Sequence, residues 1–99
     1  MAHRLAPEAE TDLDELWYYV ATTASVATAD RLVDSLTTRF FFLARYPRVG
    51  RRRDDLRLGI RSFPVGEYIV FYRLDGEDVL IQRVVRGSRD LAALLREDE

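Results

Sequence analysis

Apolar residues recur at helical spacing through the first half of the chain. One stripe follows Pro7, which suits the first turn of a helix, and contains Ala9, Leu13, Leu16, Trp17 and Val20. A polar break at residues 22–25 separates it from a second stripe, which contains Ala29, Leu32, Val33, Leu36, Phe40 and Leu43. Pro47 and Gly50 end the second pattern. The spacing therefore predicts two helices that lie antiparallel as a hairpin.

The second half of the chain has the residue types and spacing of β-strands. Residues 68–72 and 79–81 are β-branched and aromatic, and Asp75-Gly76 between them predicts a two-residue hairpin turn that pairs Arg73 with Asp78. Both faces of this hairpin carry apolar side chains, so we expect it in the middle of a sheet with a covering layer on each side. A preceding strand is expected at residues 56–63, ended by Pro64, and a weak first strand at residues 3–6. The element order β-α-α-β-β-β predicts an α+β fold with the helical hairpin packed on one face of a mostly antiparallel sheet.

The composition excludes several classes of site. The 99 residues, 47% of them hydrophobic, indicate a single domain over residues 1–99. The chain has no cysteine, and its one histidine, His3, stands near the terminus, so we expect no metal, no cofactor and no catalytic triad. No stretch approaches the roughly twenty apolar residues of a membrane span, which favours a cytoplasmic protein without a membrane partner.

Charge is distributed unevenly although the net charge is only -2. Acidic residues crowd the first half of the first predicted helix, where a solvated face that matches the helix dipole is the ordinary interpretation. Eight arginines stand between residues 39 and 61 against only Asp54 and Asp55. These arginines form either a solvated loop or a surface for an acidic partner.

Five segments resemble the ParE/RelE superfamily of type II toxin–antitoxin toxins, and they are closest to its ParE-like branch. They read LAPEAETDLDELWYYVA from Leu5, RLVDSL from Arg31, FLARYPRVGR ending at Arg51, LRLGIRSFPVGEYIVFYR from Leu56, and RVVRGSRD from Arg83. The resemblance implies a toxin that inhibits or poisons DNA gyrase and that a ParD-like antitoxin neutralises in a hetero-oligomer. Two departures stand out, since such chains usually have serine where this one has Ala6 and often have histidine where it has Arg86.

The last strand and the residues after it contain no obvious proton carrier. RelE-like relatives cut messenger RNA on the ribosome, which needs a general base and a general acid. After Gln82 the chain has no Tyr, His or Lys, and arginine is a poor base at neutral pH. Ile69 stands where such a ribonuclease carries an arginine, so we expect no catalytic residue. A RelE-like ribonuclease and an attenuated toxin that only binds its antitoxin remain the alternatives.

Arginines and off-stripe aromatic residues are the predicted contacts to antitoxin or target. We expect Tyr19 and Phe42 to lie away from the buried helix faces, or else to cover a neighbouring helix, and Trp17 is either a contact or part of the core. The full set of candidates is Trp17, Tyr19, Phe42, Arg57, Arg61, Arg73, Arg83, Arg86 and Arg89.

Overall fold

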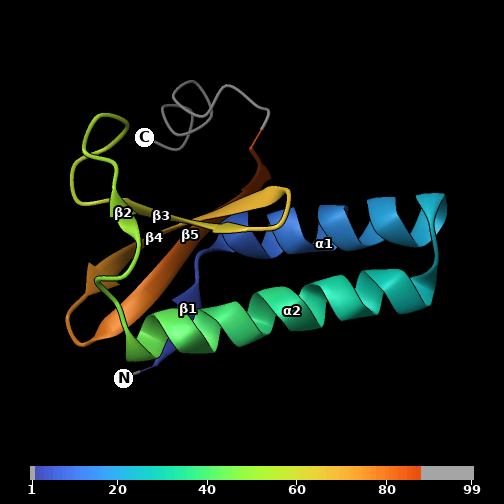
Figure 1. Cartoon of the computed structure of the whole chain (residues 1–99), viewed down its shortest axis with the longest axis horizontal. Coiled ribbons are helices and arrows are strands. Elements are labelled where there is room, and N and C mark those ends of the chain that lie inside the picture. The colour runs from blue at the N-terminus through green and yellow to red at the C-terminus, as the bar shows by residue number, and fades with distance from the viewer. Residues whose placement is uncertain (1, 88–99) are drawn as a thin grey trace.

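The structure, a computed structural model that describes residues 2–87, places two helices on one face of a five-stranded sheet (Figure 1). In chain order the elements are β1 (His3–Leu5), α1 (Pro7–Thr23), α2 (Val26–Arg45), β2 (Arg51–Arg52), β3 (Arg61–Val65), β4 (Tyr68–Asp75) and β5 (Asp78–Arg86). The strand order is β1-β5-β4-β3-β2, with β1 parallel to β5 and the other pairs antiparallel. The predicted α+β fold is confirmed, and the short strand β2 is an addition to the predicted order.

The helical hairpin forms as the apolar stripes predict. The Ser25 hydroxyl caps α2 by accepting a hydrogen bond from Thr28 N at 3.1 Å, whereas Ala6 before α1 supplies no side-chain cap. The two helices run antiparallel, and Trp17 Nε1 joins them by donating to Asp30 Oδ1 at 2.8 Å (Figure 1). The buried side chains on their inner faces are Ala9, Leu16, Ala29, Leu36, Phe40 and Leu43.

The β4–β5 hairpin exists, but its predicted register is wrong, by two residues next to the turn and by three beyond the β-bulge between Phe71 and Tyr72. Arg73 pairs with Leu80, and the turn residues are Gly76 and Glu77, with Gly76 at φ +64°. Asp75 therefore lies opposite Asp78, and Arg4 of β1 forms ion pairs with both carboxylates. This cation offsets the repulsion between the two aspartates, a pairing that would otherwise be disfavoured.

Strand β3 begins later and ends later than predicted. It starts at Arg61 instead of residue 56, and Pro64 lies inside it, opposite Ile69 of β4. Proline is tolerated here because β2 pairs only with Arg61 and Ser62, so β3 has a single neighbour at Pro64. The segment predicted to begin this strand instead forms a loop.

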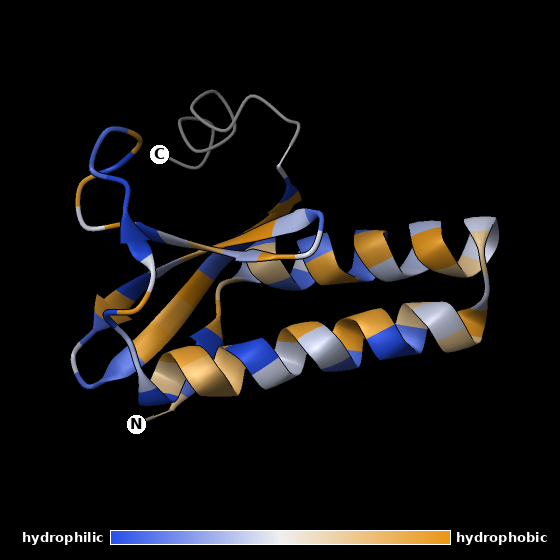
Figure 2. Cartoon of the chain, in the orientation of Figure 1, coloured by the Kyte–Doolittle hydropathy of each residue, from blue (hydrophilic) through white to orange (hydrophobic). Residues whose placement is uncertain are grey.

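Two apolar clusters form, one on each face of the sheet. The larger lies between the sheet and the helices, and Leu36, Phe40, Tyr72 and Ile81 are among its most buried members. On the opposite face, Ile60 packs with Phe71 and Val85, with Leu56 and Ile69 at the margin. The central hairpin is thus covered on both faces, as predicted, and the second cover is the loop between β2 and β3. In Figure 2, β4 and β5 are largely hydrophobic, whereas β2 at the edge of the sheet is hydrophilic.

Neither helix is long and apolar enough to cross a membrane, a finding that covers residues 2–87. In the same part of the chain, no three His, Asp or Glu side chains gather as a metal would require.

Candidate partner-binding groove

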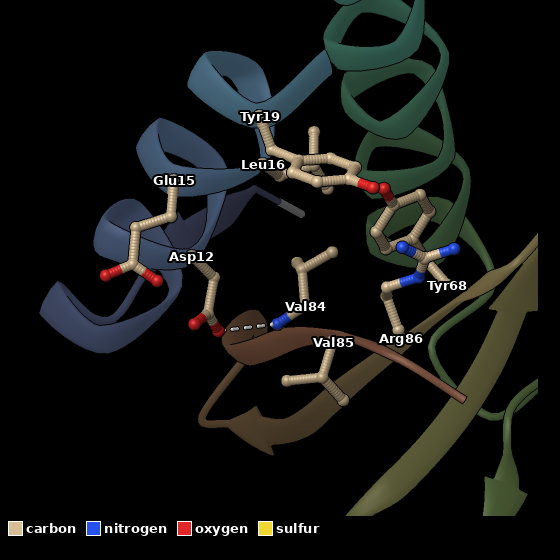
Figure 3. Close-up of a pocket in the computed structure, with 8 residues that line it drawn as sticks. All are labelled: Asp12, Glu15, Leu16, Tyr19, Tyr68, Val84, Val85 and Arg86. Carbon is tan, nitrogen blue, oxygen red and sulfur yellow. Dashed lines mark hydrogen bonds between the residues drawn. The ribbon is translucent and has the colours of Figure 1, made fainter. Parts of the chain in front are cut away.

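A groove opens where α1 continues past the end of the sheet. Its walls come from one face of α1, the last residues of β5 and the start of β4, and its volume is about 310 Å³. The lining residues, drawn in Figure 3, are Asp12, Glu15, Leu16, Tyr19, Tyr68, Val84, Val85 and Arg86.

The groove combines an apolar floor with a polar rim. Leu16, Tyr68 and Val84 are buried, whereas Glu15 and Tyr19 are exposed. The hydroxyls of Tyr19 and Tyr68 point toward one another across the groove (Figure 3). An apolar floor with a few converging polar groups is typical of sites that bind a side chain of another molecule.

Arg86 stands at the mouth of the groove. Its guanidinium lies 5.9 Å from the centre of the Tyr19 ring, and its Nη2 lies 3.3 Å from Glu67 Oε2. The two side chains of this ion pair are 46% and 75% exposed, so the pair contributes little to stability and a carboxylate of a partner can replace Glu67. Arg86 is therefore a cation that is available for an incoming acidic group.

The two buried tyrosines near this face are poor bases. Burial raises the pKa of the Tyr68 phenol, an effect that the nearby Arg86 partly opposes. Burial also raises the pKa of Tyr72, whose hydroxyl accepts from Gly50 N at 2.8 Å and donates to Pro47 O at 2.9 Å. Both phenols stay neutral near pH 7, where they can donate a hydrogen bond but cannot readily abstract a proton.

Arg83, one of the predicted surface contacts, is an internal residue. Its Nε donates to Asp12 Oδ2 at 2.8 Å and its Nη2 donates to Asp12 Oδ1 at 3.0 Å, with side-chain exposures of 11% for Arg83 and 9% for Asp12. The same carboxylate accepts from Val84 N at 2.9 Å. Strand β1 pairs with β5 only at residues 79–81, so Asp12 satisfies an edge N–H beyond the end of β1. The prediction that Arg83 is an exposed contact residue is therefore wrong. The prediction that Asp12 belongs to a solvated acidic face is also wrong.

Three further candidate arginines lie on β3, on β4 and in the loop before them, away from the groove. Arg57 Nη1 donates to Gln82 Oε1 at 3.2 Å, and Arg61 Nη1 donates to Gly50 O at 2.9 Å. Arg73 is half-buried opposite Leu80, so its predicted pairing with Asp78 is wrong. Arg61 thus helps to hold the segment after α2, and none of the three side chains lines the groove.

The aromatic candidates Phe42 and Trp17 also lie away from the groove. The ring of Phe42 is half-buried, with its centroid 5.8 Å from that of Phe63 and 5.2 Å from that of Tyr46, so of the two roles left open for Phe42 the structure shows packing against neighbouring side chains and not an open partner surface. The exposed ring is its neighbour Phe41. Trp17 is half-buried and lines a second groove, formed by β1, α1 and α2, together with Leu5, Glu10, Leu13, Asp14 and Val33.

Of the predicted contacts within residues 2–87, Tyr19 and Arg86 are the two that line the groove. Arg89 lies outside the described residues. Sequence reasoning missed Glu15 and Leu16 as groove residues, although their spacing of three and four residues from Tyr19 places all three on one helix face.

Comparison with known proteins supports one family. A family model described as the ParE toxin of the type II toxin–antitoxin system parDE matches residues 4–91. The chain is 42% identical over 84 residues to Toxin ParE3 of Caulobacter vibrioides, covering 85% of this chain and 84% of that protein. It is 31% identical over 88 residues to Toxin ParE1 of Mycobacterium tuberculosis, covering 88% and 90% of the two chains.

Two solved structures resemble the fold. The chromosomal ParDE system from P. aeruginosa contains a chain with a TM-score of 0.76 and 19% identity, covering 87% of this chain and 95% of that one. The RelBE2 toxin–antitoxin complex from Mycobacterium tuberculosis contains one with a TM-score of 0.56 and 30% identity, covering 86% and 95%.

Proposed function

Because the chain belongs to the ParE toxin family of type II toxin–antitoxin systems, we propose that it inhibits DNA gyrase in the cytoplasm by binding and not by catalysis, and that a ParD-like antitoxin neutralises it. The match to a chain of a ParDE system over 87% of this protein supports the choice of antitoxin class. Gyrase as the target rests on the family resemblance, since neither the spacing nor the charge of the residues identifies it.

The observation that carries a binding function is the groove at the end of β5. The groove has an apolar floor, two tyrosine hydroxyls that point toward one another and the displaceable cation Arg86. These features suit a short peptide segment that carries an apolar side chain and a carboxylate. We therefore assign this groove to the antitoxin.

The chemistry of the titratable groups favours binding over hydrolysis. RNA cleavage requires a group to take the proton of the 2′-hydroxyl and another to protonate the leaving oxygen. Tyr68 and Tyr72 have raised pKa values, which makes each a weaker proton acceptor at neutral pH. His3 lies against the rings of Phe40 and Phe41 and does not line the groove.

A gyrase supercoiling assay tests the target. Purified toxin is added to gyrase and relaxed plasmid, with and without the antitoxin, and both lost supercoiling and linearised plasmid are measured. We expect inhibition that the antitoxin relieves. No effect at micromolar toxin would contradict the gyrase assignment. Transcript cleavage in the presence of ribosomes would then identify a RelE-like ribonuclease, and antitoxin binding without either activity would identify an attenuated toxin.

A pair of adjacent tyrosines tests the groove. Tyr19→Arg adds a cation beside Arg86 and removes one wall of the groove, so we expect antitoxin affinity to fall at least about tenfold, as for a residue central to an interface. Tyr18→Arg is the matched control, because Tyr18 is the next residue of the same helix, is 68% exposed and does not line the groove. Titration calorimetry measures both. Equal affinities for the two variants would show that the antitoxin binds elsewhere.

A further inference from the structure

A leucine stands almost fully in solvent at the tip of the loop between β2 and β3. Leu58 is 87% exposed, more than any other large hydrophobic side chain in residues 2–87. In Figure 1 this loop extends from the β2 end of the sheet, away from the helical hairpin. We refer to residues 53–60 as the Leu58 loop.

The Leu58 loop is braced by its own hydrogen bonds. Arg53 N donates to Ile60 O at 2.9 Å across its base. Asp54 Oδ1 accepts from Gly59 N at 2.9 Å, and Gly59 has φ +82°, a backbone conformation that glycine adopts without strain. Within the loop, Arg53 Nε also pairs with Asp55 Oδ1 at 3.2 Å.

The loop is also anchored to the sheet. Ile60 is buried against Phe71 and Val85, and Leu56 packs at the margin of the same cluster, on the face opposite to the helices. Two of the three apolar residues of the loop therefore face inward, and only Leu58 faces outward. A fixed loop that holds one apolar side chain in solvent is preorganised to insert that side chain into a partner, because little conformational entropy is lost on binding.

Cations surround the base of this loop. Between residues 48 and 61 the sequence has six arginines and two aspartates. Both aspartates are already paired, Asp54 with Arg52 at 2.8 Å and Asp55 with Arg53. Arg48 and Arg51 are exposed, and neither pairs with an acid within residues 2–87. The surface that the loop presents is thus apolar at its tip and cationic at its base.

We propose that the Leu58 loop is the surface with which this toxin contacts its target, and that the matching surface is an apolar pocket rimmed by carboxylates on an acidic protein. The proposal rests on the proposed toxin function and adds the location and chemistry of the target contact. A protein fits better than duplex DNA, because an apolar tip gains nothing from phosphate and two carboxylates stand within the loop. No residue of the Leu58 loop lines the antitoxin groove, and Leu58 itself points into solvent, so the two surfaces are separable by mutation.

Leu58→Asp tests the proposal with little risk to folding, because the side chain touches almost nothing in the free protein. We expect at least a tenfold rise in the toxin concentration needed to inhibit gyrase supercoiling, with antitoxin affinity unchanged within twofold and an unchanged melting temperature. Val26→Asp is the matched control, since Val26 is 55% exposed at the start of α2, far along the chain from the loop. It should match the wild type in every assay.

The other possible outcomes show whether the Leu58 loop contacts the target, the antitoxin or nucleic acid. Inhibition by Leu58→Asp at wild-type concentrations would overturn the proposal. A loss of antitoxin affinity in the same variant would assign the loop to the antitoxin interface instead. A third outcome is that the wild type binds linear duplex DNA directly, and that Arg51→Glu weakens this binding whereas Leu58→Asp does not. That outcome would assign the Leu58 loop to nucleic-acid binding.

Growth arrest after induction of the toxin in cells tests the Leu58 loop independently of whether gyrase is the target. If the wild type arrests growth without affecting gyrase, the gyrase assignment fails, and loss of arrest in Leu58→Asp still supports the loop as the target contact. Arrest by Leu58→Asp equal to that of the wild type would overturn the loop whatever the target is. A wild type that neither arrests growth nor inhibits gyrase would overturn both proposals.

Discussion

Removing the carboxylate of Asp12 should strongly destabilise the protein. Asp12 accepts three hydrogen bonds, two from the Arg83 guanidinium and one from Val84 N, and both members of the ion pair are about nine-tenths buried. Asp12→Ala therefore leaves a buried cation without this carboxylate and a strand-edge N–H without an acceptor.

The expected size follows from these two losses. Removing one member of a buried ion pair costs about 3–5 kcal/mol, because the other charge stays desolvated. A domain of this length has a free energy of unfolding of only about 5–15 kcal/mol, so the loss is a large fraction of the total. Arg83→Met added to Asp12→Ala removes the buried cation itself, and we expect the double variant to be more stable than the single one by about 1–2 kcal/mol.

Urea unfolding followed by circular dichroism measures these differences. Glu15→Ala is the control, one turn along the same helix face, exposed and without an ion pair among the described residues, and it should change stability by less than about 0.5 kcal/mol. A loss below about 1 kcal/mol for Asp12→Ala, or a double variant less stable than the single one, would refute the view that burial makes this pair costly to break.

Three further predictions concern other buried contacts. Gly50→Ala should destabilise the protein by about 1–3 kcal/mol, because a Cβ on Gly50 would lie 2.3 Å from the Tyr72 hydroxyl, and calorimetry should detect the lower melting temperature. Phe42→Ala should cost about 2–3 kcal/mol in urea unfolding, whereas Phe41→Ala should cost less than about 1 kcal/mol; equal losses would mean that the two rings are equally buried. Because burial raises the pKa of Tyr68 and of Tyr72, the unfolded chain loses these protons first as the pH increases. The stability that these two phenols contribute should therefore be constant below about pH 10 and fall above it, with a shallower fall in Tyr72→Phe; an identical slope in that variant would contradict the assignment.

The surface around the arginine-rich segment follows from the sequence only in part. The cluster of arginines between residues 39 and 61 is visible in the sequence, and so is its contrast with the acidic start of α1. The structure shows that Arg53 and Arg61 are committed to Asp55 and to Gly50 O, whereas Arg48 and Arg51 remain exposed. Composition counts charges, but only the fold decides which of them an internal partner already satisfies.

The groove required the tertiary structure for a related reason. Tyr19 and Arg86 are 67 positions apart in the sequence and come together because α1 crosses the end of β5. Arg83 and Asp12 are separated by 71 positions, and no local pattern distinguishes a buried acid in α1 from its solvated neighbours. A contact between distant residues depends on the packing of two elements, whereas periodicity reports only which face of one element is apolar.

The sequence by itself determined the helical hairpin, the central strand pair and the layers in which they pack. Helical spacing, Pro7 and the break before Ser25 specify the helical hairpin, and the β-branched runs around Gly76 specify the strand pair, because each signal is local. The tertiary structure alone decided the register of β4 and β5. Side chains alternate between the two faces with a period of two, so the two-residue shift next to the turn keeps every apolar group on its own face and the pattern cannot detect it. Beyond the β-bulge between Phe71 and Tyr72 the shift is three residues, because the bulge inserts one extra residue into β5. Contacts with β1 and α1, through Arg4 and Asp12, accompany the observed register.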